Sequence, residues 1–312
     1  MRIAIFGSGG VGGYFGGRLA QAGFDVTFIA RGEHLSAMRE SGLRVDSIAG
    51  GFILDKVNVT DDPKTVGTVD FVICAVKAWQ VIAAANSMKP LMGDDTLVIP
   101  LQNGIEATGQ LSEVLGVDSV LGGLCALIAF QASPGHIKHI GAYPLIRFNR
   151  VNSEADVRVN YLTEMFNQCP GVKSSIPPDV NVAMWLKFLL ISPWRGLGAV
   201  SQAPIGVLLE LTETRQLLLD CMQEVQQLAV SQGVNLMGDS IQKTIAVLES
   251  LPKSSTTSMQ QDMAKGKPSE LNEQSGAIVR LGKAFDIDTR VNRFILDSLR
   301  PQELRARGAL KF

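Results

Sequence analysis

Short apolar runs alternate with segments of helical periodicity in the first half of the chain. A buried parallel strand reads as a continuous apolar run, whereas an amphipathic helix spaces its apolar residues by three or four. The predicted strands are 2–6, 26–30, 71–76 and 97–101. The predicted helices are 11–22, 80–88 and 104–115. This alternation predicts an α/β domain with a mostly parallel, doubly wound sheet and helices on both faces.

Other segments indicate antiparallel structure. Residues 42–60 contain short alternating stretches around Gly50-Gly51, which predict a β-hairpin. Residues 120–131 and 136–146 predict two strands joined by a turn at Ser133-Pro134-Gly135. We expect this pair to extend the parallel sheet as antiparallel additions.

Helical periodicity replaces the strand pattern after about residue 151. A long helix is predicted over 214–232, ending at Gly233. The pair Pro177-Pro178 cannot continue a helix, so we place a domain boundary there. The sequence therefore predicts an α/β domain over 1–176, followed by an all-α domain over 177–312.

Composition narrows the class of protein. The chain has 312 residues, of which 46% are hydrophobic and 19% charged, enough to bury the cores of two domains. A net charge of -1 gives no long-range electrostatic reason to bind nucleic acid or an anionic membrane. The chain has no signal-peptide pattern, no apolar run long enough to span a membrane and no cysteine spacing typical of a metal site. We expect a cytoplasmic protein without a bound metal; a homodimer stays open, since no surface identifies one.

A glycine-rich loop follows the first predicted strand. It reads Gly7-Ser8-Gly9-Gly10-Val11-Gly12 and opens the first helix, the context that distinguishes a dinucleotide-binding loop of the Rossmann type from a chance match. Gly7 permits a tight turn, Gly9 lets the backbone approach a pyrophosphate, and Gly12 allows close helix–strand packing. The alternative is a glycine turn that binds nothing.

Basic residues after two strands indicate which dinucleotide binds. The second strand ends at Arg31, where NAD-binding proteins usually carry an acidic residue. A guanidinium suits the 2′-phosphate of NADP(H), and Lys77 follows another strand of the same sheet. Glu33 is interpreted as a first-turn helix residue. Arg31 as a solvated surface charge is the alternative.

An enzyme that transfers hydride from such a dinucleotide to a carbonyl group would also need a proton donor. His34, His136 and His139 have no evident carboxylate partner in the sequence, and each is interpreted as structural or solvated. Lys187 lies in the otherwise apolar helical stretch 184–191. It either extends to solvent or is partly buried with a partner, and burial would make its ammonium a better proton donor.

These features occur together with further motifs that are specific in their order and spacing. The motifs are Gly7–Gly13, Ala30-Arg31-Gly32, Val76-Lys77-Ala78-Trp79-Gln80, Leu101-Gln102-Asn103-Gly104, Pro134-Gly135-His136-Ile137, Trp185-Leu186-Lys187 and Ser258-Met259-Gln260-Gln261-Asp262, with Glu270 after them. On these residues the chain resembles the ketopantoate reductases (2-dehydropantoate 2-reductases) over nearly its whole length. The resemblance implies an NADPH-dependent reduction of a 2-ketoacid to a 2-hydroxyacid, a step of pantothenate biosynthesis.

The resemblance also implies roles for individual residues. Lys187 would protonate the keto oxygen of the substrate, and Glu270 would hold Lys187 in place. Asn103 would contact the lysine and the bound ligands, and Ser258 would help to hold the substrate carboxylate. Asn103 and Glu270 would also reach the cofactor, whose 2′-phosphate end would meet Arg31 and Lys77.

Simpler interpretations of three of these residues stay open. Glu270 is also what a helix capped by Ser269 would carry in its first turn. Ser258 is a suitable cap for a helix beginning near Met259. Asn103, next to a glycine, is a typical turn residue.

The chain departs from the family pattern at two positions. The family typically carries asparagines four and eight residues after the lysine, where this chain has Ile191 and Arg195, with Pro193 between them. Losing amides that bind a substrate hydroxyl costs about 1–3 kcal/mol for each group left unpaired. Arg195 either clamps a carboxylate or points to the surface, and Ile191 would accept a larger apolar substituent. The substrate is therefore ketopantoate or a related 2-ketoacid; the competing hypotheses are an NADP-binding sensor without activity and a reductase of another superfamily branch.

Overall fold

The computed structural model describes residues 1–141 and 143–312 and divides into two compact units. The first unit comprises Met1–Gln102 and Ala107–Val180, and the second comprises Asn103–Glu106 and Asn181–Phe312. The division after Val180 lies four residues beyond the predicted boundary. It does so because Pro177 remains tied to the first unit, where its carbonyl accepts a hydrogen bond from Asn149 Nδ2 at 2.9 Å.

The first unit contains the predicted parallel sheet. Its strand order is β5-β2-β1-β6-β7, with every pairing parallel. The strands are β1 (Arg2–Phe6), β2 (Asp25–Ile29), β5 (Asn58–Thr60), β6 (Phe71–Cys74) and β7 (Leu97–Pro100). The helices of this unit are α1 (Gly10–Gln21), α2 (Gly32–Ser41), α3 (Val81–Met88), α4 (Ala107–Leu115) and α5 (Val157–Asn167). Strands β1, β6 and β7 are continuous apolar runs because helices cover the sheet, and the Rossmann-like fold is confirmed.

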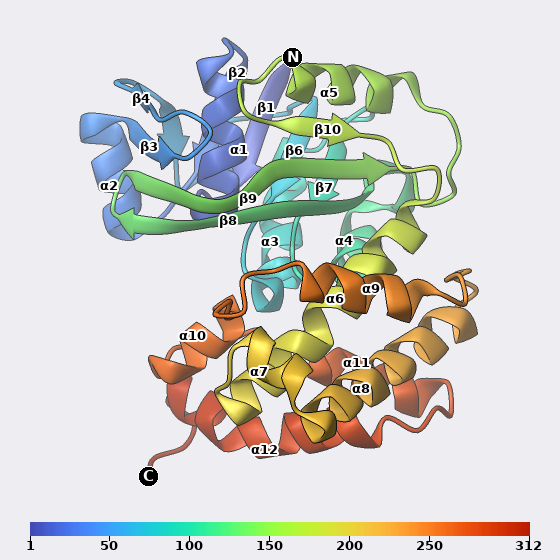
Figure 1. Ribbon diagram of the computed structural model, residues 1–312. Helices are drawn as coiled ribbons and strands as arrows, with labels where there is room; N and C mark the ends of the chain where they lie inside the picture. Colours follow the sequence, from blue (N-terminus) through green and yellow to red (C-terminus); the bar gives the residue numbers. More distant parts are fainter. The chain divides into compact units, whose positions relative to one another are not determined.

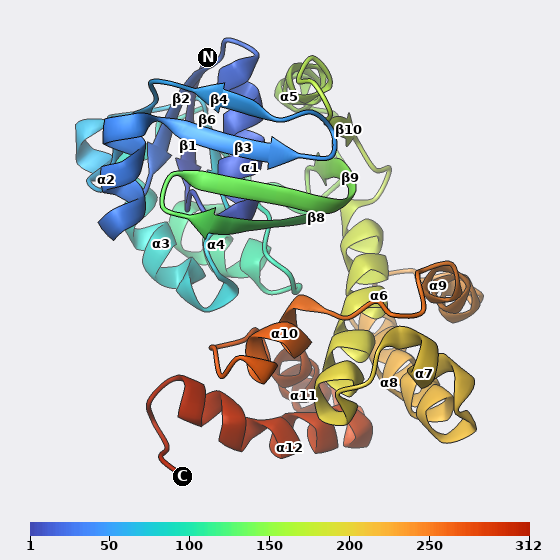
Figure 2. The ribbon, with the colours of Figure 1, turned by 60° about the vertical axis from the view of Figure 1, so that its left-hand side comes forward.

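A second sheet corrects one prediction. Strands β8 (Gly122–Ser133) and β9 (His136–Asn149) do pair antiparallel, as expected, but they do not extend the parallel sheet (Figure 1). Strand β9 instead pairs in parallel with β3 (Leu43–Ser47), which also carries the predicted hairpin partner β4 (Phe52–Leu54) (Figure 2). The short strand β10 (Lys173–Ser175) completes this sheet on the other side of β9.

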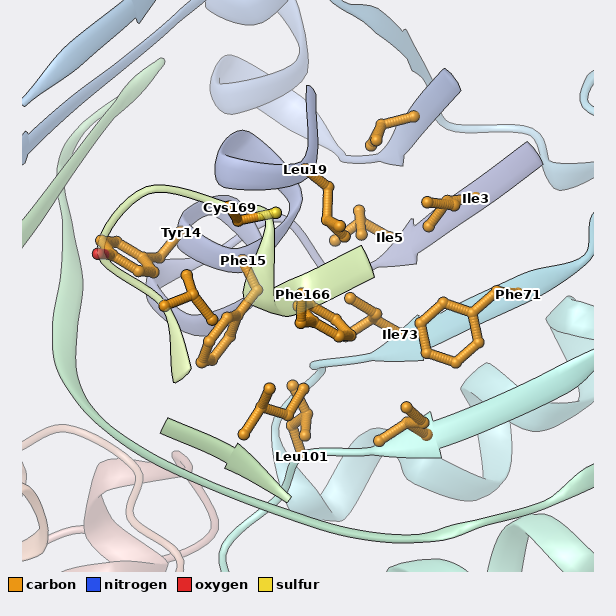
Figure 3. Packing of buried hydrophobic residues seen from close by; sticks show 14 of the residues in the cluster. Ile3, Ile5, Tyr14, Phe15, Leu19, Phe71, Ile73, Leu101, Phe166 and Cys169 are labelled. Carbon is orange, nitrogen blue, oxygen red and sulfur yellow. The ribbon is translucent and has the colours of Figure 1, made fainter. Parts of the chain in front are cut away.

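Aromatic rings fill the core of the first unit. Figure 3 shows the ring of Phe166, on α5, between those of Phe15 on α1 and Phe71 on β6. The centroid distances are 6.2 Å to Phe15 and 6.4 Å to Phe71, with the rings nearly perpendicular. Edge-to-face contacts of this kind add to the hydrophobic gain of burying the rings. These contacts pack helix α5 against the sheet. The helix therefore belongs to the first unit, although it follows residue 151, where helical periodicity replaces the strand pattern.

The regular secondary structure of the second unit, in the residues that the structure describes, consists of helices. They are α6 (Val180–Ser201), α7 (Ile205–Glu210), α8 (Thr212–Ser231), α9 (Ser240–Glu249), α10 (Ser258–Ala264), α11 (Ser275–Ala284) and α12 (Arg290–Ala306). Helix α8 matches the predicted helix and buries Leu218, Met222 and Val225 in the core of this unit. None of the helices in the described part of the chain is both long and apolar enough to cross a membrane.

Candidate active site

The glycine loop joins β1 to α1, and each of its glycines meets a different steric demand. Gly7 has φ +97°, a backbone conformation that side chains disfavour. A Cβ on Gly12 would lie 2.0 Å from the carbonyl oxygen of Gly7 and 3.0 Å from Ile5, so only glycine allows α1 to approach β1 this closely. Gly10 is packed against the backbone of β8 at Ala129. Of the remaining loop residues, Ser8 lies before the helix and Val11 lies in the first turn of α1.

Gly9 differs from its neighbours because the space beside it is open. A Cβ built on Gly9 would have no atom of the described chain within 4 Å. Gly9 also precedes the first residue of α1, where the exposed amides and the helix dipole attract an anion. The loop therefore offers room and hydrogen-bond donors for a pyrophosphate, and its residues fit a dinucleotide.

Arg31 and Lys77 follow the carboxyl ends of the two parallel strands that lie on either side of β1. Arg31 lies just beyond β2 and Lys77 just beyond β6, and both side chains are exposed. Gln102 holds the end of β6, because its Nε2 donates to the carbonyls of Cys74 and Val76, each at 3.0 Å. Glu33 lies in the first turn of α2, as expected. Two cations thus flank the edge of the sheet at which the glycine loop lies.

His34 connects this loop to the second sheet. Its Nε2 donates to the carbonyl of Ser8 at 2.8 Å, and its Nδ1 accepts from the backbone N–H of Gly135 at 3.0 Å. Because a carbonyl only accepts and an amide N–H only donates, the ring is neutral with its proton on Nε2. Burial lowers the pKa of His34, in agreement with the neutral form. The structural interpretation of His34 fits these contacts.

The other two histidines also have protein partners. His136 Nε2 lies 2.8 Å from a carboxylate oxygen of Asp46, a partner that was not evident in the sequence. The partner was hidden in the sequence because Asp46 and His136 are on the neighbouring strands β3 and β9. His139 is buried and contacts Ser47 Oγ at 2.9 Å and the carbonyl of Gly141 at 3.0 Å. Both sets of contacts lie within the second sheet and fit structural roles.

Helix α6 of the second unit carries the lysine singled out in the sequence. Lys187, Ile191 and Arg195 are spaced by four residues, which places them on one face of the helix, and all three are half-buried. The helix continues through Pro193. This row of three residues on α6 therefore has a cationic side chain at each end, Lys187 and Arg195, with the apolar Ile191 between them.

Glu270 lies in the turn between α10 and α11 and gathers donors from three parts of the second unit. Its Oε2 accepts hydrogen bonds from Asn103 Nδ2 at 3.1 Å and from Gln274 Nε2 at 3.3 Å. Arg195 Nη1 lies 3.4 Å from the same oxygen, in an ion pair whose side chains are only 14% and 13% exposed. Arg195 is therefore not a surface residue. Asn103 and Glu270, which are 167 positions apart in the sequence, meet in this unit.

Two alternatives raised by the sequence are wrong. Ser258 is the exposed first residue of α10 and not its cap, since Thr257 caps this helix in a reciprocal box with Gln260. Glu270 is not a first-turn residue either, because α11 begins five residues later, at Ser275. Asn103 does lie in a bend beside Gly104, which has φ +118°, but its side chain also reaches Glu270.

Sequence reasoning missed two residues beside Glu270. Gln274 is fully buried, and its spacing of four from Glu270 was the one signal that it faces the same way. Its Oε1 has no hydrogen-bond partner among the described residues. Glu273 is half-buried; burial raises the pKa of its carboxyl group, and the nearby charge of Glu270 adds to the rise. The site therefore contains two carboxyl groups with different environments.

Comparisons with known proteins agree with this architecture. Residues 3–152 match the family model "Ketopantoate reductase PanE/ApbA", and residues 179–303 match the model of its C-terminal domain. A 2-dehydropantoate 2-reductase of Nostoc is 30% identical over 86% of this chain and 85% of its own. An uncharacterized oxidoreductase of Bacillus subtilis is 28% identical over 97% and 99% of the two chains.

A solved structure extends the likeness to three dimensions. The PanE/ApbA family ketopantoate reductase from Ralstonia eutropha superposes with a TM-score of 0.89 and 32% identity, covering 98% of this chain and 100% of that chain. The two family models together span most of the sequence, one over each half of the two-part architecture. The chain belongs to the ketopantoate reductase family of oxidoreductases.

Proposed function

We propose that this protein reduces a 2-ketoacid to a 2-hydroxyacid with NADPH, with 2-dehydropantoate as the first candidate substrate. The observation that carries the proposal is the meeting of Asn103 with Glu270 in the unit that contains Lys187. These are the residues to which the family resemblance assigns proton transfer and ligand contact. A sensor that had lost catalysis would have no need to keep all three.

The reaction adds a hydride to the keto carbon and a proton to the keto oxygen. NADPH, when bound, supplies the hydride from its nicotinamide. Lys187 gives the proton from Nζ to the oxygen, so that a hydroxyl group forms as the carbonyl π bond breaks. Glu270 orients the ammonium of Lys187, while its Oε2 accepts from the three donors described above. Asn103 keeps the Glu270 carboxylate in place and contacts the ligands.

The cofactor assignment rests on charge. The open space beside Gly9 takes the pyrophosphate, and Arg31 and Lys77 take the 2′-phosphate by charge-assisted hydrogen bonds. NADH lacks this phosphate, so it gives these two cations no partner. We infer a preference for NADPH.

A related 2-ketoacid is the second candidate substrate, and the row on α6 favours it. Ile191 presents an apolar surface where an amide would bind a hydroxyl group, and Arg195 adds a positive charge beside Glu270. Ser258, Ile191 and Arg195 would then contact the substrate, with the arginine near its carboxylate. Such a site suits a 2-ketoacid with an apolar substituent.

Cofactor oxidation tests the proposal. The purified protein is mixed with NADPH and a panel of 2-ketoacids that includes ketopantoate, and the loss of NADPH absorbance is followed. We expect turnover with at least one ketoacid and a fall in kcat of at least about 10²-fold in Lys187→Ala, the size of a general-acid contribution. Lys283→Ala, which removes an exposed lysine of α11, is the control. NADPH binding without turnover across the panel would favour the sensor hypothesis, and wild-type turnover in Lys187→Ala would refute the mechanism.

A further inference from the structure

Ser269, the residue directly before Glu270, is held by the last helix of the second unit. We propose that Glu303, on α12, is a positioning residue that fixes the Glu270 carboxylate through Ser269. The inference rests on the role proposed above for Glu270. It adds to the site a residue 33 positions further along the chain that has no contact with substrate or cofactor in the proposed mechanism.

The contacts between Glu303 and Ser269 are short and cover most of the polar groups involved. The two carboxylate oxygens of Glu303 accept from the backbone N–H of Ser269 at 3.0 and 3.2 Å, and one accepts from Ser269 Oγ at 2.6 Å. Arg307, one turn later on α12, donates from Nε to Glu303 at 2.6 Å and from Nη2 to the carbonyl of Ser269 at 3.0 Å. The N–H, hydroxyl and carbonyl groups of Ser269 are therefore all bound by this pair.

The burial of Glu303 shows that the arrangement has little freedom. Its side chain is 3% exposed, and Ser269 is buried as well. A buried carboxylate is costly unless it is paired and hydrogen-bonded, so Glu303 can lie here only in the orientation that satisfies these donors. Several hydrogen bonds therefore hold the backbone of Ser269 in a defined position relative to α12.

The residue on the other side of Glu270 is fixed too. Leu271 is fully buried in the core of the second unit, and its N–H donates to Ser269 Oγ at 3.3 Å. The residues on both sides of Glu270 are therefore held in place, and the side chain of Glu270 points to Asn103. A shift of Ser269 would move the Glu270 carboxylate, and a displacement of about 1 Å can cost about 10²-fold in rate.

A second buried carboxylate in the same unit gives a matched control. Glu224, on α8, accepts from the backbone N–H groups of Val291 at 2.8 Å and Asn292 at 3.0 Å, at the start of α12. It is also buried and also binds backbone amides, but its partners are not next to Glu270. Replacing either residue by glutamine puts a donor amide among donors and destabilises the fold, and in Glu303→Gln the ion pair with Arg307 is lost as well.

The experiment compares Glu303→Gln with Glu224→Gln in the full chain. We expect both to lower the melting temperature, but only Glu303→Gln to lower kcat by about 10-fold more than its loss of folded protein explains, with the KM for NADPH changed less than kcat. Equal effects of the two variants on kcat would overturn the inference. If Glu303→Gln does not fold, Ser269→Ala is measured in its place; it removes the 2.6 Å hydroxyl contact with Glu303 and the 3.3 Å contact with the N–H of Leu271, and it keeps the bonds of Glu303 to the backbone N–H of Ser269.

Two further measurements separate this inference from the proposed function. Glu270→Gln tests the role of Glu270 itself, so a loss of turnover there, without a specific loss in Glu303→Gln, overturns the positioning role alone. A crystal structure of Glu303→Gln needs no turnover. We expect the Glu270 carboxylate in that structure to have lost its contact with Asn103 Nδ2; an unchanged contact would refute the positioning role, whatever the activity of the protein.

Discussion

Arg195 changes the charge of the proposed substrate site. With Lys187 and Glu270 alone, a site of this family has one positive and one negative side chain, and the ketoacid adds a second negative charge. In the proposed site, Arg195, in its ion pair with Glu270, would supply the positive charge that balances the carboxylate of the substrate. The same substitution removes an amide that would pair with a substrate hydroxyl group. Under the proposed function, this one residue would set both the affinity for ketoacids in general and the selectivity for a hydroxylated one.

Replacing Arg195 by asparagine tests this balance. We expect Arg195→Asn to raise the ratio of kcat/KM for ketopantoate to kcat/KM for the same ketoacid without its hydroxyl group by about 10-fold, because the amide regains a partner only in the hydroxylated substrate. The KM for both should rise, since a cation near the carboxylate is lost. Steady-state kinetics with the two ketoacids measures the ratio, and an unchanged ratio would remove Arg195 from the set of specificity-determining residues.

His34 makes the stability of the first unit depend on pH. Burial lowers its pKa below the ordinary value near 6.5, so below about pH 6.5 the unfolded chain binds a proton that the folded chain resists. The contribution is fully present above the unfolded pKa and is lost as the pH falls toward the folded pKa. His34→Asn removes this titration and retains an acceptor for the N–H of Gly135. Urea unfolding at about pH 7.5 and about pH 5.5 should show a larger fall for the wild type than for His34→Asn; parallel falls would contradict the buried neutral ring.

The start of α1 shows how one element serves both folding and binding. Gly12→Ala would place a Cβ 2.0 Å from the carbonyl oxygen of Gly7, so the helix must move away from β1. Gly9→Ala would place its Cβ in open space, where no described atom lies within 4 Å. The two glycines are three residues apart, yet they differ in role. Gly12 allows the close packing of α1 on β1, and Gly9 leaves open the space proposed for the cofactor.

These two substitutions should separate stability from cofactor binding. We expect Gly12→Ala to lower the free energy of unfolding by about 1–3 kcal/mol, the usual cost of overpacking. Gly9→Ala should leave the unfolding free energy within about 0.5 kcal/mol of the wild type but weaken NADPH binding at least about 10-fold, because the methyl group occupies the pyrophosphate space. Denaturant unfolding and fluorescence titration measure the two effects. Tight NADPH binding by Gly9→Ala would show that the cofactor does not use this loop.

The elements that sequence patterns predicted well are those whose neighbours are close in the chain. Strand β1, the glycine loop and α1 form one continuous unit, so their periodicity and glycines were sufficient. The place of β8 and β9 was not predictable in this way. Their sheet depends on pairing with β3, in which Arg44 lies opposite His136. The sequence of a single strand does not show which other strand it pairs with.

At the scale of the whole molecule, the same limit applied to the candidate site. Gly7 and Arg31 were recognisable because their local context carries the signal, and Lys187 because it interrupts an apolar helix. The contact of Asn103 with Glu270 required residues 103–106 to join the second unit, although the chain on both sides belongs to the first. The bonds between Glu303 and Ser269 span 34 residues and leave no periodic signature. Candidate residues could thus be proposed from residue type and local context, whereas the contacts that surround them could be found only from the fold.

The division into two units predicts how the cofactor affects thermal unfolding. The glycine loop, Arg31 and Lys77 all belong to the first unit, whose core is separate from the apolar cluster of the second. A ligand at 100 times its Kd stabilises the folded state that binds it by about 2.7 kcal/mol. For a unit of this size, NADPH should raise the melting temperature of the first unit by about 5–10 °C.

The role proposed for Arg31 predicts that part of this shift depends on the 2′-phosphate. In the wild type we expect NADPH to raise the melting temperature more than NADH at the same concentration, because only NADPH gives Arg31 an anionic partner. In Arg31→Ala the two shifts should become nearly equal, whereas Arg39→Ala, which removes an exposed arginine within α2, should keep the difference. Differential scanning calorimetry with each dinucleotide measures both shifts. Equal shifts in the wild type would refute the preference for NADPH, and a difference that persists in Arg31→Ala would assign the phosphate to Lys77 instead.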